Sequence, residues 1–249
     1  MGEKNLLKQD SSIEEKELKP ISGWIALFIG ILFILSPVFG FINLVNTEND
    51  IFLIVTIILF IVAIFIFCGL KIVNPNESIV FVLFGKYYGT IKKPGFFFVN
   101  PFVSAINPTY ESQVTKLSKV GDKDSEQETT TSNTKKISLK AMTLNNQKQK
   151  VNDELGNPII IGTIVIWRVI NPTKAVFNVE NYKTFLSIQC DSTIRNVARL
   201  YPYDSEDTED YSEKSLRGSS QEIADKLKEE LQKRVEIAGI EVEEVRITH

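Results

Sequence analysis

The chain has 249 residues, of which 43% are hydrophobic and 24% are charged, and its formal net charge is -3. This slightly acidic balance argues against a nucleic-acid-binding protein, since such proteins gather a surplus of Lys and Arg on one face. Two Cys exclude a disulfide framework and a multi-cysteine zinc site. The single His, at position 249, excludes a His-ligated metal and the triads and dyads that need an internal imidazole.

Two long apolar segments without charge lie near the N-terminus. They run from Ile21 to Val45 and from Ile51 to Leu70, and each has about 20 residues or more, enough for a helix to cross a hydrocarbon core of roughly 30 Å. Neither carries the polar stripe at a 3.6-residue period that marks a surface helix of a globular domain. Buried core helices are one alternative, but a core of this size could not bury two helices that are apolar all round. A cleaved signal peptide is the other, but the first segment is too long for one and no small-residue cleavage site precedes the second. We therefore predict a transmembrane two-helix hairpin over residues 21–70.

The charges around this hairpin predict its orientation. The link Asn46–Asp50 is short enough to force an antiparallel arrangement, and it holds two acids and no Lys or Arg. Lysines lie on both flanks, at Lys4, Lys8, Lys16, Lys19, Lys71, Lys86, Lys92 and Lys93. Because Lys and Arg are retained on the cytoplasmic side, we predict a two-span protein of the cell membrane. Its N-terminal segment, residues 1–20, and its domain over residues 71–249 are then both cytoplasmic.

Short apolar runs between turn residues predict strands after residue 70. Ser78–Phe84 is rich in β-branched and aromatic residues, which favours a buried strand. Lys93–Phe96 fits a type II turn, with Pro94 presetting φ and Gly95 accepting a positive φ. Further extended segments are expected at Phe96–Val99, Ala105–Lys116, Lys136–Leu139 and Gln149–Val151.

Residues 118–134 form a polar insert in this domain. Val120 is its one large apolar side chain. Such a segment cannot bury enough apolar surface to offset the entropy lost on ordering. We therefore expect a mobile loop, without a metal-binding or substrate-binding role for its carboxylates.

The remainder of the chain shows a strand pattern, then two helical patterns, then a strand pattern. Ile159–Ile170 is predicted to be a strand whose odd-numbered positions form the more apolar face. The next helix, Asn181–Leu200, places its apolar stripe at Tyr182, Phe185, Gln189, Ile194, Val197 and Ala198. The last helix is capped by Ser219 or Ser220 and buries Ile223, Leu227, Leu231, Val235 and Ala238. Gly239 ends it in a left-handed conformation, and a strand follows over Ile240–Ile247. This order predicts an α+β fold with an antiparallel sheet packed with helices.

The sequence offers no set of residues for catalysis, cofactor binding or metal binding. Gly85, Gly89 and Gly95 are too widely spaced for a phosphate loop. A hydrolase using Ser219 or Ser220 would lack an internal His to activate the hydroxyl. The remaining candidates are interpreted as solvated acids, apolar thiols and a core aromatic residue: Asp153, Glu154, Asp204, Glu206, Asp207, Glu209, Asp210, Cys68, Cys190 and Trp167. We expect a protein that is not an enzyme and uses no cofactor.

An ordered series of short motifs runs from Lys71 to Thr248. It comprises Asn74–Glu77, Phe84–Thr90, Lys93–Gly95, Asn100–Phe102, Lys136–Leu139, Lys150–Asp153, Gly156–Pro158, Trp167–Val169, Tyr201–Asp204, Leu216–Gly218 and Ala238–Val242. Each motif alone is weak, but their order along the chain is specific. The series resembles the SPFH or band 7 domain of stomatin, prohibitin and flotillin, and is most similar to the bacterial multi-span members of that group.

This resemblance implies a membrane-anchored scaffold protein. Such a protein homo-oligomerises into rings or cages and organises membrane lipid into microdomains, or organises a membrane protease or another integral membrane protein. The alternative is a regulatory subunit of a membrane protease or channel. The resemblance carries over no catalytic, cofactor-binding or metal-binding residue and no nucleic-acid partner. Family members continue into a long coiled coil where this sequence ends at His249, so we expect weaker side-by-side contacts here.

Overall fold

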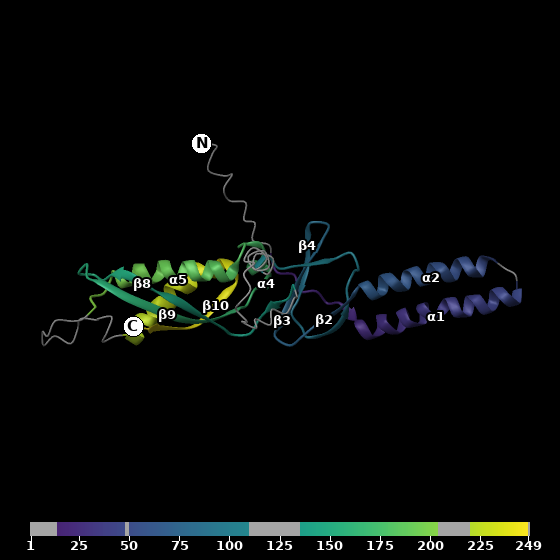
Figure 1. Cartoon of the computed structure of the whole chain (residues 1–249), viewed down its shortest axis with the longest axis horizontal. Helices are drawn as coiled ribbons and strands as arrows, with labels where there is room; N and C mark the ends of the chain where they lie inside the picture. The colour runs from purple at the N-terminus through teal and green to yellow at the C-terminus, as the bar shows by residue number, and fades with distance from the viewer. Residues whose placement is uncertain (1–13, 48–49, 110–134, 204–219, 249) are drawn as a thin grey trace, which may run out of the picture. The chain divides into compact units, whose positions relative to one another are not determined.

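The computed structural model describes residues 14–47, 50–109, 135–203 and 220–248, but not the side chains of 39–47, 50, 52–53 and 220. The described chain forms two compact units (Figure 1). The N-terminal unit comprises Lys16–Ile106 and Lys135–Ile137, and the C-terminal unit includes Asn107–Thr134 and Ser138–His249. The predicted insert 118–134, the acids of 204–210, Ser219 and His249 lie outside the described residues, as does most of the predicted extended segment Ala105–Lys116.

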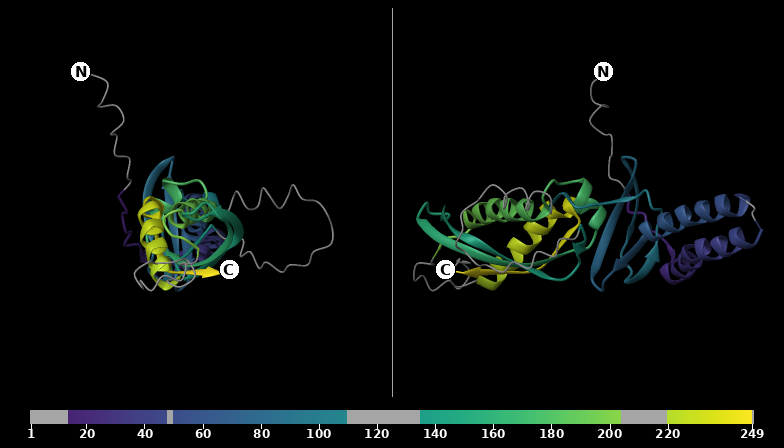
Figure 2. Two further views of the ribbon diagram at one scale, coloured as in Figure 1. Left: turned by 90° about the vertical axis from the view of Figure 1, so that its left-hand side faces the viewer. Right: turned by 45° about the vertical axis from the view of Figure 1, so that its right-hand side comes forward.

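Both uncharged segments of the sequence form helices, α1 over Gly23–Thr47 and α2 over Asp50–Cys68. The two helices lie side by side (Figure 1 and the right panel of Figure 2). Small residues allow this close approach. Ala63 of α2 is fully buried, and a Cβ atom on Gly30 of α1 would lie only 2.8 Å from the ring of Phe67. Any larger side chain at Gly30 would push the Phe67 ring aside.

Two antiparallel sheets complete the N-terminal unit. The first has the order β1-β5-β2, and the second has the order β4-β3-β6, with β7 paired to β3. Their bounds are β1 Ile21–Ser22, β2 Leu70–Val73, β3 Glu77–Leu83, β4 Lys86–Ile91, β5 Gly95–Phe98, β6 Ser104–Ile106 and β7 Ile137–Ser138. Their core consists of Val73, Ile79, Phe81, Ile91, Val99 and Val103. An ion pair of 3.1 Å between Lys136 and Glu77 joins the residue before β7 to the first residue of β3.

The central strand of the first sheet holds both ends of the helical hairpin. β1 directly precedes α1, and β2 follows α2 after Gly69. Ile21 of β1 and Leu70 of β2 are both register partners of Phe98 in β5. A Cβ atom on Gly69 would overlap the carbonyl oxygen of Val99. The chain therefore enters and leaves the two helices at one strand.

The predicted type II turn at Lys93–Phe96 is wrong, and such a turn lies earlier in the chain. Gly95 has a positive φ, but its value of 152° belongs to the first residue of β5, whereas a type II turn needs about 80°. The turn between β2 and β3 has Pro75 at its second position and Asn76 at its third, with a φ of 59°. The Glu77 N–H donates to the Asn74 carbonyl oxygen at 3.2 Å and closes it.

The C-terminal unit is a three-stranded antiparallel sheet with the order β10-β9-β8, packed with helices (Figure 2). The strands are β8 Met142–Asn152, β9 Pro158–Val169 and β10 Ile240–Thr248. The helices are α4 Pro172–Phe177, α5 Tyr182–Ala198 and α6 Ser220–Val235, followed by the 3-10 turn η1 Glu236–Ala238. α5 packs on β8 and α6 packs on β10. The predicted α+β class with antiparallel sheets is confirmed.

The burial of side chains confirms the predicted faces of β9 and α6 and corrects that of α5. Every odd position of β9 from 159 to 169 is buried, and so are the predicted apolar residues of α6 and η1. In α5, however, Leu186 and Cys190 are buried where Phe185 and Gln189 were predicted, and those two are only half-buried. Leu186 and Cys190 follow Tyr182 at intervals of four residues and therefore lie on the same face of α5 as Tyr182. This spacing places them, rather than the adjacent Phe185 and Gln189, against the sheet.

Candidate functional site

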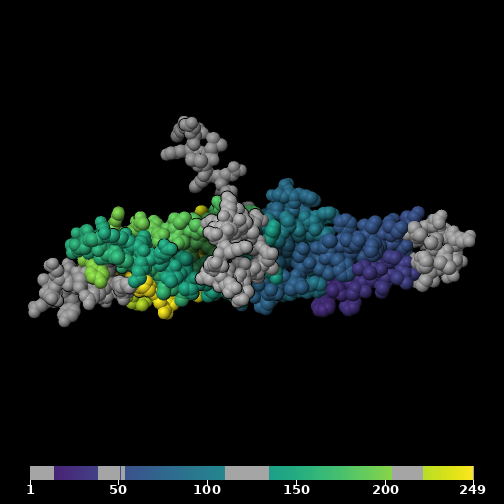
Figure 3. All heavy atoms as spheres, viewed as in Figure 1, coloured from purple at the N-terminus to yellow at the C-terminus, as the bar shows by residue number. Residues whose placement is uncertain are grey.

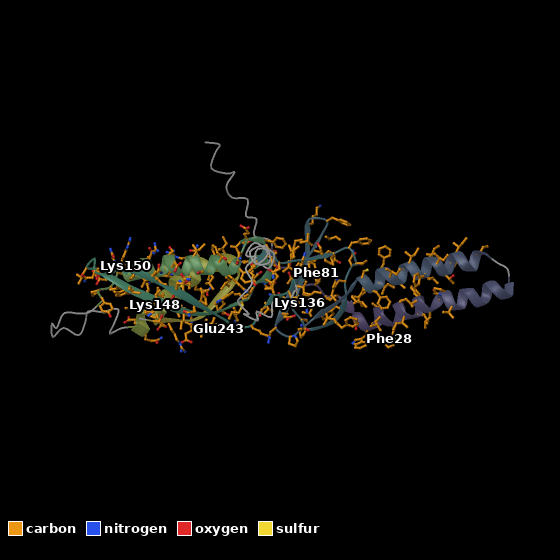
Figure 4. The ribbon with its side chains drawn as sticks, viewed as in Figure 1. Phe28, Phe81, Lys136, Lys148, Lys150 and Glu243 are labelled. Carbon is orange, nitrogen blue, oxygen red and sulfur yellow. The ribbon has the colours of Figure 1, made fainter. Side chains whose placement is uncertain are left out.

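The largest apolar surface of the described chain covers the helical hairpin. Large apolar side chains follow one another along both helices with exposed fractions between 40% and 68%. In α2 they include Ile57, Ile58, Phe60, Ile61, Val62, Ile64 and Phe65. Successive positions of a helix point about 100° apart, so this surface extends around the helix. Figure 4 draws side chains along both helices and labels Phe28 on α1, and Figure 3 shows the outer surface of the same two helices.

Over the residues whose side chains the structure describes, no helix is both long enough and apolar enough to cross a membrane.

Aromatic rings lie at the end of the hairpin that adjoins the sheets. Trp24, in the first turn of α1, meets Phe96 edge-on with ring centroids 5.7 Å apart. Phe65, in the last turn of α2, lies 5.8 Å from Phe102, and Phe102 stacks on Phe84 at 6.4 Å. Phe84 and Phe102 are 84% and 59% exposed. Phe84 was predicted to end a buried strand, but β3 ends at Leu83. For this reason the exposed cluster was not predicted.

The segment before α1 pairs with β4 through a parallel bridge between Glu17 and Thr90, and it borders a cavity. The Leu18 N–H donates to the Thr90 carbonyl oxygen and the Thr90 N–H to that of Lys16, both at 2.9 Å. Gly89 allows this pairing, because a Cβ atom there would overlap the side chain of Leu18. The adjoining cavity of about 490 Å³ is lined mainly by apolar side chains, with Lys19 and Asn100 among its polar groups. Its size lies in the range of small-molecule sites.

The carboxylate of Asp153 is a structural group in the turn between β8 and β9. It is 3% exposed and accepts hydrogen bonds from the Asn157 N–H at 2.7 Å and from the Tyr203 N–H at 3.2 Å. Burial raises the pKa of Asp153, but these hydrogen bonds together outweigh burial and leave the pKa below its usual value. An acid held ionised in this way is suited to fixing a turn. The sequence predicted the turn but also a solvated acid, and the second prediction is wrong for Asp153, because the local pattern does not show the bond from Tyr203, 50 residues away.

Asp153→Asn is expected to make stability less dependent on pH in the acid range. A carboxylate whose pKa is lower in the folded state stabilises the fold above its unfolded pKa of about 3.9, and this contribution is lost as the pH falls through the folded pKa. The Tm of the unsubstituted chain should therefore fall more steeply below about pH 4 than that of the variant. Parallel Tm curves from pH 6 to pH 2.5 would contradict this role of Asp153.

Cys190 and its neighbours form a buried polar contact within the core of the C-terminal unit. The Cys190 thiol lies 3.3 Å from the Thr163 hydroxyl, and burial raises the pKa of this thiol. Burial also raises the pKa of Tyr182 to about 12. Both groups are therefore neutral at physiological pH, which suits packing rather than nucleophilic chemistry. Trp167 is 3% exposed and packs edge-on against Tyr182 with ring centroids 6.0 Å apart, in line with its predicted place in the core.

The described residues bring no other predicted site together. Gly85, Gly89 and Gly95 have positive φ values but lie in or beside the strands β3, β4 and β5. Among the side chains that the structure describes, no three or more His, Cys, Asp or Glu residues are grouped as metal ligands would be. Cys68 is exposed at the end of α2. The exposed apolar hairpin and its aromatic base are therefore the main candidate for function.

The described chain consists of an apolar helical hairpin followed by α+β structure, and the comparison with known families identifies that second part. The SPFH domain / Band 7 family matches residues 71–249, and the chain belongs to this family. The chain is also similar to a stomatin homolog from Pyrococcus abyssi (strain GE5 / Orsay), with 28% identity over 146 residues. That match covers 59% of this chain and 44% of the relative, so the chain spans less than half the length of the relative it matches.

Proposed function

We propose that this protein is a membrane-anchored scaffold that homo-oligomerises and organises a patch of bilayer. In this proposal α1 and α2 are two membrane spans, and both the N-terminal segment and the SPFH domain face the cytoplasm. The observation that carries the proposal is the exposure of large apolar side chains along the described parts of both helices. Contiguous apolar surfaces of this kind mark sites that contact a membrane or another protein.

The dimensions and charges of the hairpin support a membrane as the environment of this surface. At about 1.5 Å per residue, the 25 residues of α1 and the 19 residues of α2 extend roughly 37 Å and 28 Å, close to a hydrocarbon core of about 30 Å. Lys71 and Lys86 follow the hairpin, and the link at its other end contains no Lys or Arg. This asymmetry supports the cytoplasmic orientation of the domain.

The edges of the C-terminal sheet support self-assembly. β8 and β10 are the outer strands, and each pairs with β9 alone among the described strands. They are 11 and 9 residues long. Long outer strands present unpaired N–H and C=O groups that can pair with another chain. A head-to-tail contact between unlike edges produces a ring when the rotation closes, which is the kind of assembly that the SPFH family membership favours.

Charges placed in the hairpin test the anchor. Leu32→Asp combined with Ile58→Asp puts a charge near the middle of each helix, at side chains that are 66% and 54% exposed. In a membrane, each Asp disfavours insertion by about 3 kcal/mol relative to Leu or Ile. We therefore expect the unsubstituted chain to float with vesicles in a density gradient and the double variant to stay at the bottom. Ile160→Asp, at a 62% exposed site of β9, is the control that should still float.

The particle size in mild detergent tests the scaffold. Light scattering coupled to size exclusion should give a mass of several chains, and crosslinks within intact membranes should join mainly copies of this chain. A strictly monomeric particle would contradict homo-oligomerisation. One dominant crosslinked partner of another sequence would instead favour the regulatory subunit of a membrane protease or channel.

A further inference from the structure

The turn between β3 and β4 holds a bulky residue in a disfavoured backbone conformation. Phe84 and Gly85 are the two loop residues, with φ values of 46° and 81°. Positive φ at both positions is typical of the type I′ turn, in which Asn-Gly and Asp-Gly are strongly preferred. A positive φ at a bulky aromatic residue is a clear outlier. Backbone strain of this kind is concentrated at functional sites. We therefore expect the Phe84 side chain to have a function.

Packing in the core does not account for Phe84. Its side chain is 84% exposed, more than any other large hydrophobic side chain that the structure describes. Its ring contact is with Phe102, at 6.4 Å and an interplanar angle of 29°, and Phe102 is itself 59% exposed. We call this exposed pair, Phe84 and Phe102, the aromatic tip.

Contact with α2 fixes the level of the aromatic tip along the hairpin. Phe102 lies 5.8 Å from Phe65, which is three residues before Cys68, the last residue of α2. At about 1.5 Å per residue, Phe65 is roughly 4.5 Å from the end of the helix. The tip therefore lies beside the last turn of α2, where a spanning helix meets the headgroups. Trp24, in the first turn of α1, is 62% exposed.

We propose that the aromatic tip inserts into the interfacial layer of the bilayer beside the hairpin, as a further membrane contact of the folded domain. This inference rests on the proposed membrane anchor. Aromatic side chains favour this layer, and the exposed Lys86, next in sequence to Gly85, is placed to meet anionic headgroups. The partner is thus a lipid surface, and insertion would give the strained Phe84 the apolar surroundings that the described part of the chain does not provide.

A fluorophore at the tip tests this inference in the full chain. Phe84→Cys in a Cys68→Ser background is labelled with an environment-sensitive dye; Cys190 is 2% exposed and remains unlabelled in the folded protein. The chain is reconstituted into vesicles of phosphatidylcholine and phosphatidylglycerol. We expect a blue-shifted emission that brominated phospholipids quench. Leu155→Cys is the matched control, since Leu155 is 68% exposed and also precedes a glycine of positive φ, and its dye should report water.

The outcomes separate this inference from the proposed anchor. A chain that floats with vesicles but gives the same emission at Phe84→Cys and Leu155→Cys overturns the insertion of the tip and leaves the anchor intact. A chain that does not float overturns both. A blue shift with quenching at Phe84→Cys alone supports insertion.

A second variant distinguishes membrane contact from a structural role. Asn tolerates a positive φ, so Phe84→Asn should leave the Tm unchanged or raise it by roughly 2 to 4 °C. Leu155→Asn should leave the Tm unchanged. A marked fall in Tm for Phe84→Asn would show that the fold needs the ring at this position, and would overturn the assignment of Phe84 to lipid contact.

Discussion

Gly239→Val is expected to destabilise the C-terminal unit by about 2 to 5 kcal/mol. Gly239 has a φ of 64°, which costs an L-residue about 1–2 kcal/mol. A Cβ atom would also overlap the Asn171 carbonyl oxygen and lie 2.8 Å from the Asn171 Cβ, and overpacking of this kind adds about 1–3 kcal/mol. The Gly239 carbonyl oxygen accepts from the N–H groups of Ile170 and Asn171 at 2.9 and 3.0 Å, so movement away would break these bonds. Urea unfolding measures the loss.

Gly156→Val is the matched control for this substitution. Gly156 has a similar φ of 85°, but a Cβ atom there would have no other atom within 4 Å. It should show only the left-handed cost of about 1–2 kcal/mol. Equal losses for the two variants would contradict the steric part of the interpretation at Gly239.

Trp167→Ala is expected to destabilise the same unit by about 3 to 5 kcal/mol, because it removes a large buried aromatic side chain. Trp167 lies in the central strand, where its register partners are Met142 of β8 and Val242 of β10. It also packs edge-on against Tyr182 at the start of α5. One substitution therefore loosens contacts of three strands and a helix. Thermal and urea unfolding, monitored by circular dichroism, measure the effect.

Trp167→Phe provides the comparison that isolates packing. The indole N–H of Trp167 is buried and has no hydrogen-bond partner in the described part of the chain. Phe keeps an aromatic ring for the contact with Tyr182 and removes this unsatisfied donor, whose burial is unfavourable. We expect a smaller loss than for Trp167→Ala, because Phe keeps most of the buried aromatic volume. A loss as large as that of Trp167→Ala would contradict the role of the ring contact with Tyr182.

The secondary structure could be predicted where one face of an element is buried and the other is exposed. β9 and α6 show this clearly, since their apolar residues recur at periods of two and of three to four. β8 begins at Met142 but was predicted only over Gln149–Val151. Most of its 11 residues are polar, so the sequence lacks the alternation of apolar and polar residues that predicts a strand. The prediction of a type II turn at Lys93–Phe96 was wrong, because a Pro-Gly pair favours a positive φ at Gly95 but does not determine the type of turn.

The apolar hairpin could be found in the sequence, whereas its aromatic base could not. Long uncharged runs are a local property of the chain. The contact of Phe65 with Phe102 joins residues 37 positions apart, and that of Phe102 with Phe84 depends on where β3 ends. The predicted buried strand over Ser78–Phe84 included Phe84 and so treated its ring as buried. Phe84 has a positive φ, and the only sign of this in the sequence is Gly85, the residue that follows it.

The attachment of α1 and α2 to one strand has a mechanical consequence. Because β1 and β2 both pair with β5, with Phe98 as a common register partner, no flexible linker separates the hairpin from the sheet. The hairpin and this sheet are therefore expected to move as one rigid body, so that a tilt of the helices rotates the sheet by the same angle. If the helices span a bilayer, a change in its thickness or curvature that tilts them is transmitted to this sheet as torque.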